Sequence, residues 1–382
     1  MSRDTTAYRP VADPARWSGI SHPTSVVDRD RVLANLRHVR DQADASGVRF
    51  RPHVKTHNST TIAALYREVG VTAITVSSVE MARRFADAGW DDITIAFPVN
   101  VRAIEELGRL AAAVHLGLLV DSPEAATALD RIDAPVDLWL DIDVGYGRTG
   151  IPWDDPAALG RVLEAADRSG RHRVRGVLTH AGHGYHVSDP EARAALWDEV
   201  AERMGAARDA LAGPGSSGSL EISVGDTPTG GAVSRFDGVD EIRVGNFVFF
   251  DMQQHALGTC TSADLALVIA CPVVGIYPGR GEIVVQGGSV HLSRDAAPGP
   301  AGVMNHGQLA VMGADGWDLL PVSMAHVRGL SQEHGIIRCV PEVLDQVRLG
   351  DLVFIVPAHA CLAANQVSEF VYRTEPGAPF RA

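Results

Sequence analysis

The sequence contains almost no lysine. Of its 34 basic residues, Lys55 is the only lysine and the other 33 are arginines. The chain thus uses arginine wherever a plain positive charge is sufficient, which indicates that Lys55 does something a guanidinium cannot do. A desolvated amine can lose its proton near neutral pH and attack a carbonyl to form a Schiff base, whereas a guanidinium stays charged. On this count alone, the alternative is that an arginine-rich chain retains one lysine by accident.

Other absences exclude several classes of protein. The sequence has no apolar run of about 18 residues, so no membrane-spanning segment is expected. Residues 1–7 lack the apolar core of a signal peptide. The net charge of −13 argues against nucleic acid as a partner, because basic patches are missing. Four cysteines are too few for a disulfide scaffold, so we expect a soluble, reduced, cytoplasmic protein.

What the sequence does contain is a repeated alternation of short apolar runs and helical stretches. With 382 residues and 46% hydrophobic content, it is long enough for one barrel plus an extra module. Repeated strand–helix units imply a parallel sheet, and eight units favour a closed barrel over an open sheet. We therefore predict an α/β fold with a (β/α)₈ TIM-type barrel over residues 22–256. Its expected strands are Val48–Val54, Thr72–Val76, Ile93–Phe97, His115–Val120, Val136–Val144, Val174–Thr179, Leu220–Val224 and Ile242–Phe250.

Helical patterns separate most of these strands, for example over Ser78–Ala88, Val101–Ala113 and Pro190–Ala212. Another helix is expected to follow Val26-Val27 and to run to about residue 45, with Asp28 as its N-cap. The segment 225–240 predicts only a short or irregular last helix.

After about residue 256 the sequence becomes rich in strand patterns, and Gly, Pro and Asp separate them. We predict a C-terminal all-β domain over residues 257–382, which residues 1–21 are expected to join. Its expected strands are Leu265–Tyr277, Glu282–Val285, Leu309–Met312, Val322–Val327, Gly335–Val340 and Asp351–Val356.

In a barrel of this kind, functional residues follow the carboxyl ends of the strands, and phosphate is held after strands seven and eight. Lys55 ends the first strand. Segments rich in Gly, Ser and Thr follow the later strands, at 143–150, 179–186, 223–231 and 243–246, and offer N–H groups and hydroxyls to an anion. A reactive lysine with a phosphate site suggests pyridoxal phosphate (PLP).

Six motifs extend over nearly the whole chain: RPHVKTH around Lys55, DVGYGRTG around Arg148, GDTPTG around Thr227, RVGNFVFFDMQ over 243–253, QEHG over 332–335 and PAHAC over 357–361. With these motifs the chain resembles the fold-type III PLP enzymes of the D-serine dehydratase and D-threonine aldolase family, which are related to alanine racemase.

The resemblance implies a role for each matched residue. Lys55 would form the Schiff base with PLP and later move the Cα proton, and Arg148 would face the pyridine nitrogen with Tyr185 beside the cofactor. Thr227, Gly245 and Asn246 would help to hold the phosphate. His359 and Cys361 would bind a divalent metal, with Zn²⁺ first and Mg²⁺ or Mn²⁺ as alternatives. The resemblance also implies a homodimer with a D-amino acid substrate.

These roles make chemical sense together. An arginine does not protonate the pyridine nitrogen, so the ring stays a weak electron sink, and a metal on the substrate hydroxyl would compensate. Imidazole and thiolate suit zinc, and two protein ligands leave the shell open to substrate and water. Within the family His-x-Cys is typical of dehydratases and His-x-Asp of aldolases. Asn58 and Asp226 depart from the expected pattern and leave the substrate preference open.

Several patterns have other interpretations. Gly145–Gly150 matches G-x-G-x-x-G, which would indicate a dinucleotide site if it opened the first strand–helix unit of an open sheet. His180, His183 and His186 fit either a second metal cluster or, preferably, a polar active-site loop. His53 and His57 are open to a purely hydrogen-bonding role, and the remaining cysteines, Cys260, Cys271 and Cys339, are expected to be small core residues.

The predicted function is a PLP- and metal-dependent lyase that converts a D-β-hydroxy amino acid, of the D-serine or D-threo-3-hydroxyaspartate type, into a keto acid and ammonia. The first alternative is a D-threonine aldolase-type cleavage to glycine and an aldehyde. The second is a PLP-binding regulatory protein without turnover.

Overall fold

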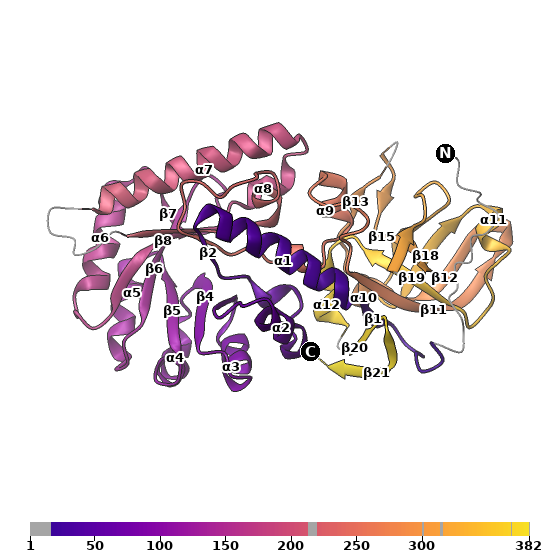
Figure 1. Cartoon of the computed structure of the whole chain (residues 1–382), viewed down its shortest axis with the longest axis horizontal. Helices are drawn as coiled ribbons and strands as arrows, with labels where there is room; N and C mark the ends of the chain where they lie inside the picture. Colours follow the sequence, from indigo (N-terminus) through magenta and orange to yellow (C-terminus); the bar gives the residue numbers. More distant parts are fainter. Residues whose placement is uncertain (1–16, 213–219, 300–301, 314–315, 368, 382) are drawn as a thin grey trace. The chain divides into compact units, whose positions relative to one another are not determined.

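The computed structural model describes residues 17–212, 220–299, 302–313, 316–367 and 369–381 (Figure 1). The chain divides into two compact units. The first, which we call the barrel unit, consists of Arg37–Lys55 and Ile62–Gly245. The second, the β-rich unit, consists of Met1–Leu36, Thr56–Thr61 and Asn246–Ala382.

The barrel unit contains eight parallel strands that close on themselves. Along the sheet they follow the order β2, β10, β9, β8, β6, β5, β4, β3. Closure is completed by a bridge between His53 and Thr75, where Thr75 N donates to Pro52 O at 2.9 Å. This confirms the predicted TIM-type barrel. The strands are β2 (Arg49–Phe50), β3 (Ile74–Val76), β4 (Asp92–Pro98), β5 (His115–Val120), β6 (Asp137–Asp143), β8 (Arg173–Thr179), β9 (Glu221–Val224) and β10 (Glu241–Ile242).

Each predicted barrel strand overlaps one of these observed strands. The largest difference is at the eighth, predicted over Ile242–Phe250, because β10 is only two residues long and the chain then turns into the 3₁₀ helix η6 (Asn246–Val248). The apolar run after residue 246 is buried within the β-rich unit, so its hydrophobicity reflects core packing rather than strand pairing.

Helices connect the barrel strands and lie outside them in Figure 1. The N-caps follow the sequence signals: Asp28 Oδ1 accepts from the amides of residues 30 and 31, and Ser78 Oγ accepts from Met81 N at 3.1 Å. The last helix has only four residues, as the sequence predicts. The helices are α1 (Arg29–Ser46), α2 (Thr60–Glu68), α3 (Val79–Asp87), α4 (Ile104–Ala111), α5 (Pro123–Ala128), α6 (Pro156–Asp167), α7 (Pro190–Leu211) and α8 (Thr227–Gly230).

The β-rich unit is built around six strands that also form a closed barrel. Going around it, the neighbours are β11, β12, β18, β17, β15 and β19, and every pair is antiparallel. This confirms the predicted all-β domain. The strands are β11 (Leu267–Tyr277), β12 (Glu282–Gln286), β15 (Gly307–Gly313), β17 (Ala325–Leu330), β18 (His334–Cys339) and β19 (Leu352–Pro357).

Further short elements complete this unit. β1 pairs with β11 and β20, and β21 pairs with β20, so the N-terminal strand belongs to this sheet. The sequence prediction did not include β16, β20 or β21. The additional elements are β1 (Thr24–Val27), β13 (Ala297–Pro298), β14 (Met304–Asn305), β16 (Gly316–Leu319), β20 (Glu369–Tyr372), β21 (Glu375–Arg381), α9 (Met252–Leu257), α10 (Ser289–Leu292), α11 (Pro341–Leu344) and α12 (Ala360–Gln366).

The N-terminal segment packs into the core of the β-rich unit where it is described. The rings of Trp17 and Phe354 are 5.1 Å apart, and both side chains are buried together with Val26 and Val268. The rest of the predicted N-terminal addition, residues 1–16, lies outside the described residues. Among the described helices, none combines the length and apolar character needed to cross a membrane.

Candidate active site

Lys55 lies at the carboxyl end of the first barrel strand, in the short 3₁₀ helix η2 (Val54–Thr56). Hydrogen bonds hold the backbone before it, because Arg51 N donates to Ile242 O at 3.0 Å and His53 N donates to Val244 O at 2.9 Å. The strand thus continues to His53 beyond its two fully paired residues, and the exposed Lys55 side chain follows where the pairing ends. Lys55 therefore lies at the carboxyl end of the barrel strands, as the sequence predicts, and functional residues of such barrels lie at this end.

Two histidines share the electrostatic environment of Lys55. Burial lowers the pKa of His53 well below its usual value, and the charges of Lys55 and Arg243 lower it further. Burial, followed by the charge of Lys55, lowers the pKa of His180 to about 3. His180 Nδ1 lies 2.6 Å from Gly225 O, and a carbonyl only accepts, so Nδ1 carries the proton. Both rings are therefore neutral at pH 7.

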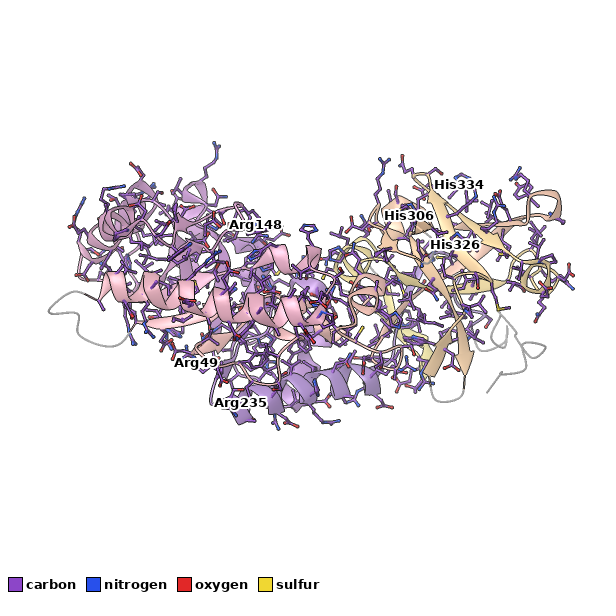
Figure 2. The ribbon with its side chains drawn as sticks, turned by 90° about the horizontal axis from the view of Figure 1, so that it is seen from above. Arg49, Arg148, Arg235, His306, His326 and His334 are labelled. Atoms are coloured by element: carbon purple, nitrogen blue, oxygen red, sulfur yellow. The ribbon has the colours of Figure 1, made fainter. Side chains whose placement is uncertain are left out.

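Arg148 and Tyr146 extend from the loop after β6. Arg148, labelled in Figure 2, is exposed. Its guanidinium carbon lies 5.5 Å from the centroid of the Tyr146 ring. Tyr146 also packs edge-on against His180, with 6.0 Å between centroids. The charge of Arg148 contributes to the lowered pKa of His180, as does that of Lys55. The structure therefore brings Arg148 into the electrostatic neighbourhood of Lys55.

Arg243 is a second arginine in this neighbourhood, and the sequence interpretation gave it no role. Its guanidinium is buried and donates to Ser223 Oγ at 2.7 Å and to Thr179 O. Burial lowers its pKa to about 10, and burial also raises the pKa of nearby Asp141 to about 6. The available signal was a charged residue at the second position of the predicted eighth strand, inside the RVGN motif.

The loop after β9 has the features of a phosphate cradle. Asp226 points into its own turn, because its carboxylate accepts from Thr229 N at 2.8 Å and from Thr229 Oγ1 at 2.6 Å. Burial raises the pKa of Asp226 to about 6. Thr227 Oγ1 is buried and has no hydrogen-bond partner among the described residues. A buried hydroxyl without a partner is costly, so this atom fits a ligand oxygen.

Close packing brings two other segments to this loop. A Cβ on Gly225 would lie 2.9 Å from Arg243 Cβ, and one on Gly184 would lie 2.6 Å from Thr229 Cγ2. Only glycine allows these approaches. Tyr185 follows Gly184 in the 3₁₀ helix η5 (Gly182–His186) and is half-buried, so its turn lies against the candidate phosphate loop.

In the β-rich unit, His359 and Cys361 lie at the junction between β19 and α12. His359 is the N-cap residue of α12, and its Nδ1 lies 2.6 Å from Asp295 Oδ2. Cys361 Sγ lies 3.3 Å from Thr56 Oγ1 and 3.5 Å from Asn246 Nδ2. Imidazole, thiolate and polar neighbours form a donor set that suits a borderline-soft divalent cation.

The charge balance of this cluster also fits a cation. Burial opposes the charge of His359, but Cys361, Asp251 and Asp295 together raise its pKa to about 10. Asp251 is fully buried and accepts from Asn246 Nδ2 at 2.6 Å and from Ala360 N at 2.9 Å. An excess of negative charge that holds a proton on His359 would equally favour a metal ion in its place.

The side-chain amide nitrogen of Asn246 is engaged near the proposed metal ligands, so any contact of this residue with a phosphate would come from its backbone N–H. Its Nδ2 contacts Asp251 and Cys361, as given above, although its Oδ1 is buried and has no partner among the described residues. Gly245, which precedes it, is buried at the end of the barrel unit.

Two alternative interpretations of the sequence are not supported. The described residues hold no group of three or more metal-binding side chains, so the His180–His186 segment is a polar loop. The G-x-G-x-x-G match leads into the short strand β7 (Ile151–Pro152), which pairs with β6, and α6 begins only at Pro156. It lies in a closed barrel and does not open a helix, which a dinucleotide site requires.

The fold and the lysine-centred barrel mouth define an enzyme of the alanine racemase type. Residues 27–253 match the family model described as "Alanine racemase, N-terminal domain", and residues 266–372 match a serine dehydratase domain. The chain belongs to the D-serine dehydratase family of fold-type III PLP enzymes, which confirms the predicted resemblance. Membership makes it a lyase and supports PLP as its cofactor.

Three relatives illustrate the range of this family. D-threo-3-hydroxyaspartate dehydratase of Delftia sp. is 34% identical over 90% of this chain and 92% of its own length. Its structure superposes with a TM-score of 0.86 over 95% of this chain and 97% of that one, at 31% identity. D-serine dehydratase of Schizosaccharomyces pombe is 26% identical over 90% and 86% of the two chains. D-threonine aldolase of Arthrobacter sp. is 26% identical over 92% and 89%.

Two similar structures are variants of a D-threo-3-hydroxyaspartate dehydratase. One replaces a histidine by alanine, and the other replaces a cysteine two positions later by alanine and is described as the metal-free form. A histidine and a cysteine thus stand two positions apart in that relative, as His359 and Cys361 do here.

Proposed function

We propose that this protein is a PLP- and metal-dependent dehydratase of D-β-hydroxy amino acids, with D-threo-3-hydroxyaspartate or D-serine as the substrate type. The observation that carries the proposal is the joint position of His359 and Cys361 among the carboxylates Asp251 and Asp295. The similarity to the dehydratases of Delftia and fission yeast supports the same reaction.

Lys55 is the proposed cofactor anchor and the group that takes the Cα proton. Bound PLP would supply the electron sink that makes this proton acidic. His53 and His180 are neutral and add no positive charge near Lys55. Loss of the Cα proton and of the β-hydroxyl, together one water, leaves an enamine, whose hydrolysis gives the keto acid and ammonia.

Arg148 and Tyr185 are proposed as cofactor contacts, with Arg148 at the pyridine nitrogen. Arg243 is an alternative for this contact, because its guanidinium is fixed by Ser223 and Thr179 whereas Arg148 is exposed. Either arginine would leave the ring nitrogen unprotonated. Thr227, Gly245 and Asn246 are proposed to hold the phosphate, and the unpartnered Thr227 Oγ1 supports this role.

His359 and Cys361 are proposed to hold the metal, with Zn²⁺ as the first choice and Mg²⁺ or Mn²⁺ as alternatives. A cation bound here would assist departure of the substrate's β-hydroxyl. Zn²⁺ is preferred because one of the two ligands is a thiolate, and thiolates favour zinc over the harder ions.

Retro-aldol cleavage to glycine and an aldehyde is the second candidate function, because the Arthrobacter D-threonine aldolase is also a relative. There a base would take the hydroxyl proton and the Cα–Cβ bond would break. A PLP-binding regulatory role is less favoured, because carrying the cofactor does not require a metal pair.

A panel of D-β-hydroxy amino acids tests the function. We expect the purified protein to be yellow, and borohydride to fix the cofactor to Lys55 and not to the Lys55→Ala variant. Incubation with D-threo-3-hydroxyaspartate, D-serine and D-threonine should release keto acid and ammonia. Release of glycine and an aldehyde instead would establish the aldolase, and a colourless protein would refute the cofactor assignment.

We also propose a cytoplasmic homodimer. An enzyme that uses the Cys361 thiolate needs a reducing compartment, which supports the first point. Sedimentation equilibrium should give twice the 40.6 kDa mass of the chain. We further propose that residues 22–256 form the cofactor-binding domain and that residues 257–382 form the metal-binding domain.

A further inference from the structure

The carboxylate of Asp295 is hydrogen-bonded to the proposed metal ligand His359. Asp295 Oδ2 lies 2.6 Å from His359 Nδ1, and a carboxylate only accepts, so Nδ1 is the protonated nitrogen. This leaves Nε2 as the nitrogen that can face a cation. Histidine ligands of metals commonly donate their second N–H to a carboxylate, which fixes the tautomer and the ring orientation and raises the basicity of the ligand.

The segment that carries Asp295 is attached at one end to α12, which carries Cys361, and at the other end to α9. Before it, Ser293 N donates to Oε1 of Gln366, the last residue of α12, at 3.1 Å. After it, Ala296 O accepts from Gln253 Nε2 in α9 at 3.2 Å. The distance between Asp295 and the start of α12 is therefore set by the fold and does not depend on the single His359 contact.

The backbone of Asp295 itself is also held. His306, labelled in Figure 2, donates through Nδ1 to Asp295 O at 3.0 Å. Asp295 N donates to Ser293 Oγ at 3.1 Å. With N–H, C=O and carboxylate all engaged, little freedom is left for this side chain to turn away from His359.

Ser293 adopts a backbone conformation that a side chain normally avoids. Its φ is 67° and its ψ is 173°, a region essentially reserved for glycine, and the residue is only 2% exposed. Such a conformation is strained and persists only where the surroundings impose it, most often at functional sites. Here the strained residue is two positions before Asp295 and shapes the turn that directs the carboxylate to His359.

We propose that Asp295 is a positioning residue for the metal site: it holds His359 in the tautomer and orientation that present Nε2 to the cation. This inference rests on the proposed metal site at His359 and Cys361. Asp295 acts through His359 and is not itself a ligand.

The test is metal binding to the PLP-loaded full chain after a chelator has removed its metal. Zn²⁺ affinity is measured by competition with a chromophoric chelator, and Co²⁺ is used to record the thiolate-to-metal absorption band. Asp295→Asn keeps the shape and removes the charge. Asp264→Asn is the matched control, because Asp264 is a carboxylate in a loop of the same unit and accepts from Thr261 N and Oγ1, both at 2.7 Å.

We expect Asp295→Asn to weaken Zn²⁺ binding by about 10- to 100-fold while one ion per chain and the Co²⁺–thiolate band are retained. Asp264→Asn should bind as the unaltered protein does. The metal-free Asp295→Asn protein should keep the far-ultraviolet circular dichroism and the cooperative unfolding of the unaltered protein, which shows that weaker metal binding does not come from loss of the fold. As a second variant, His306→Asn keeps a donor near the Nδ1 position and should retain most of the affinity.

Two results would overturn the inference. Equal Zn²⁺ affinity in the Asp295→Asn and unaltered proteins would show that Asp295 does not orient the ligand. A changed Co²⁺ spectrum in that variant would make Asp295 a ligand itself. Failure of the underlying metal site looks different: the unaltered protein would then bind no Co²⁺, or Cys361→Ala would keep the thiolate band.

Discussion

The hydroxyl of Thr227 has opposite effects on folding and on cofactor binding. It is buried without a partner among the described residues, whereas the hydroxyl of Thr229, two positions later, is bonded to Asp226. If Thr227 serves a phosphate oxygen, the cofactor-free protein carries an unsatisfied polar atom that the loaded enzyme uses.

We therefore expect the near-isosteric substitution Thr227→Val to stabilise the cofactor-free protein and to weaken PLP binding. It should raise the unfolding temperature of the cofactor-free protein, because an unpaired buried hydroxyl costs about 1–3 kcal/mol. It should also weaken PLP binding by about tenfold or more, the value of one hydrogen bond to a charged group. Thermal unfolding and PLP titration measure the two shifts. Thr229→Val should instead lower the unfolding temperature, and PLP binding unchanged in Thr227→Val would contradict the phosphate role.

His57 provides a pH dependence of folding. The ring is fully buried, its Nδ1 accepts from Ser59 N at 3.0 Å, and burial lowers its pKa to about 3. The unfolded chain takes up a proton near pH 6.5, but the folded chain does not until about pH 3. The contribution of the neutral His57 to the free energy of unfolding is therefore present above pH 6.5 and is lost as the pH falls from 6.5 toward 3.

We expect His57 to account for about 2 kcal/mol of the free energy of unfolding lost between pH 6.5 and pH 5, at about 1.4 kcal/mol for each pH unit. His57→Asn keeps an acceptor for Ser59 N and does not titrate. Urea unfolding at the two pH values should show a smaller loss for this variant, although its overall stability is lower because of the smaller side chain. An equal loss in both proteins would show that His57 is not the source.

At the scale of elements, a chain of polar side chains connects the barrel strands internally. Arg51 donates to Asp92 at 2.6 Å and to Glu241 at 2.8 Å. Glu241 in turn accepts from Ser223 Oγ at 2.7 Å, and Ser223 accepts from Arg243 at 2.7 Å. Burial opposes the charge of Arg51, but Glu241 and Asp92 raise its pKa. This series of hydrogen bonds ends at Arg243, next to the candidate cofactor site.

Breaking this chain at Glu241 should cost far more than breaking a surface pair. Glu241 is fully buried, so Glu241→Gln removes one of the two carboxylates that compensate the buried Arg51 and is expected to cost about 3–5 kcal/mol. Arg235→Gln removes an ion pair with Asp237 in which both side chains are more than half exposed, and should cost less than about 1 kcal/mol. Denaturant unfolding measures both, and similar costs would show that the buried chain adds nothing.

At the scale of the whole molecule, we expect that removal of the metal abolishes activity but does not unfold the protein. The β-rich unit has its own apolar core around Trp17 and Phe354, and Lys55 lies in the other unit. Chelation should therefore abolish dehydration while the PLP absorbance and the far-ultraviolet circular dichroism are retained, and Zn²⁺ should restore turnover. The unfolding temperature should fall only by the mass-action contribution of the lost ion. Activity that survives chelation would refute the metal assignment.

Much of the architecture was predictable because its signals are local. The alternation of apolar runs and helical stretches predicted all eight barrel strands, and Asp28 and Ser78 mark the starts of their helices as N-caps do. The strands β16, β20 and β21 were missed. β16 and β20 are only four residues long, and the pairing of the three strands with β15, β1 and β20 is a property of the assembled sheet.

The candidate site was predictable only where a motif marked it. Lys55, Thr227, His359 and Cys361 stand out in the sequence because each belongs to a recognisable motif. Asp295 does not, because nothing around it in the sequence distinguishes it from other loop acids. Its partner His359 is 64 residues away, and the pairing exists only once the turn at Ser293 has been formed.

By itself the sequence determined the class of fold, the single amine available to a carbonyl cofactor and the His-x-Cys pair, because composition, periodicity and short motifs are encoded within a few residues. Only the tertiary structure decided which side chains meet. Cys361 lies beside Thr56 across 305 residues of sequence, and Arg243 is bonded to Ser223 from another strand. These contacts depend on closure of the two barrels, which orders residues that are distant in the chain.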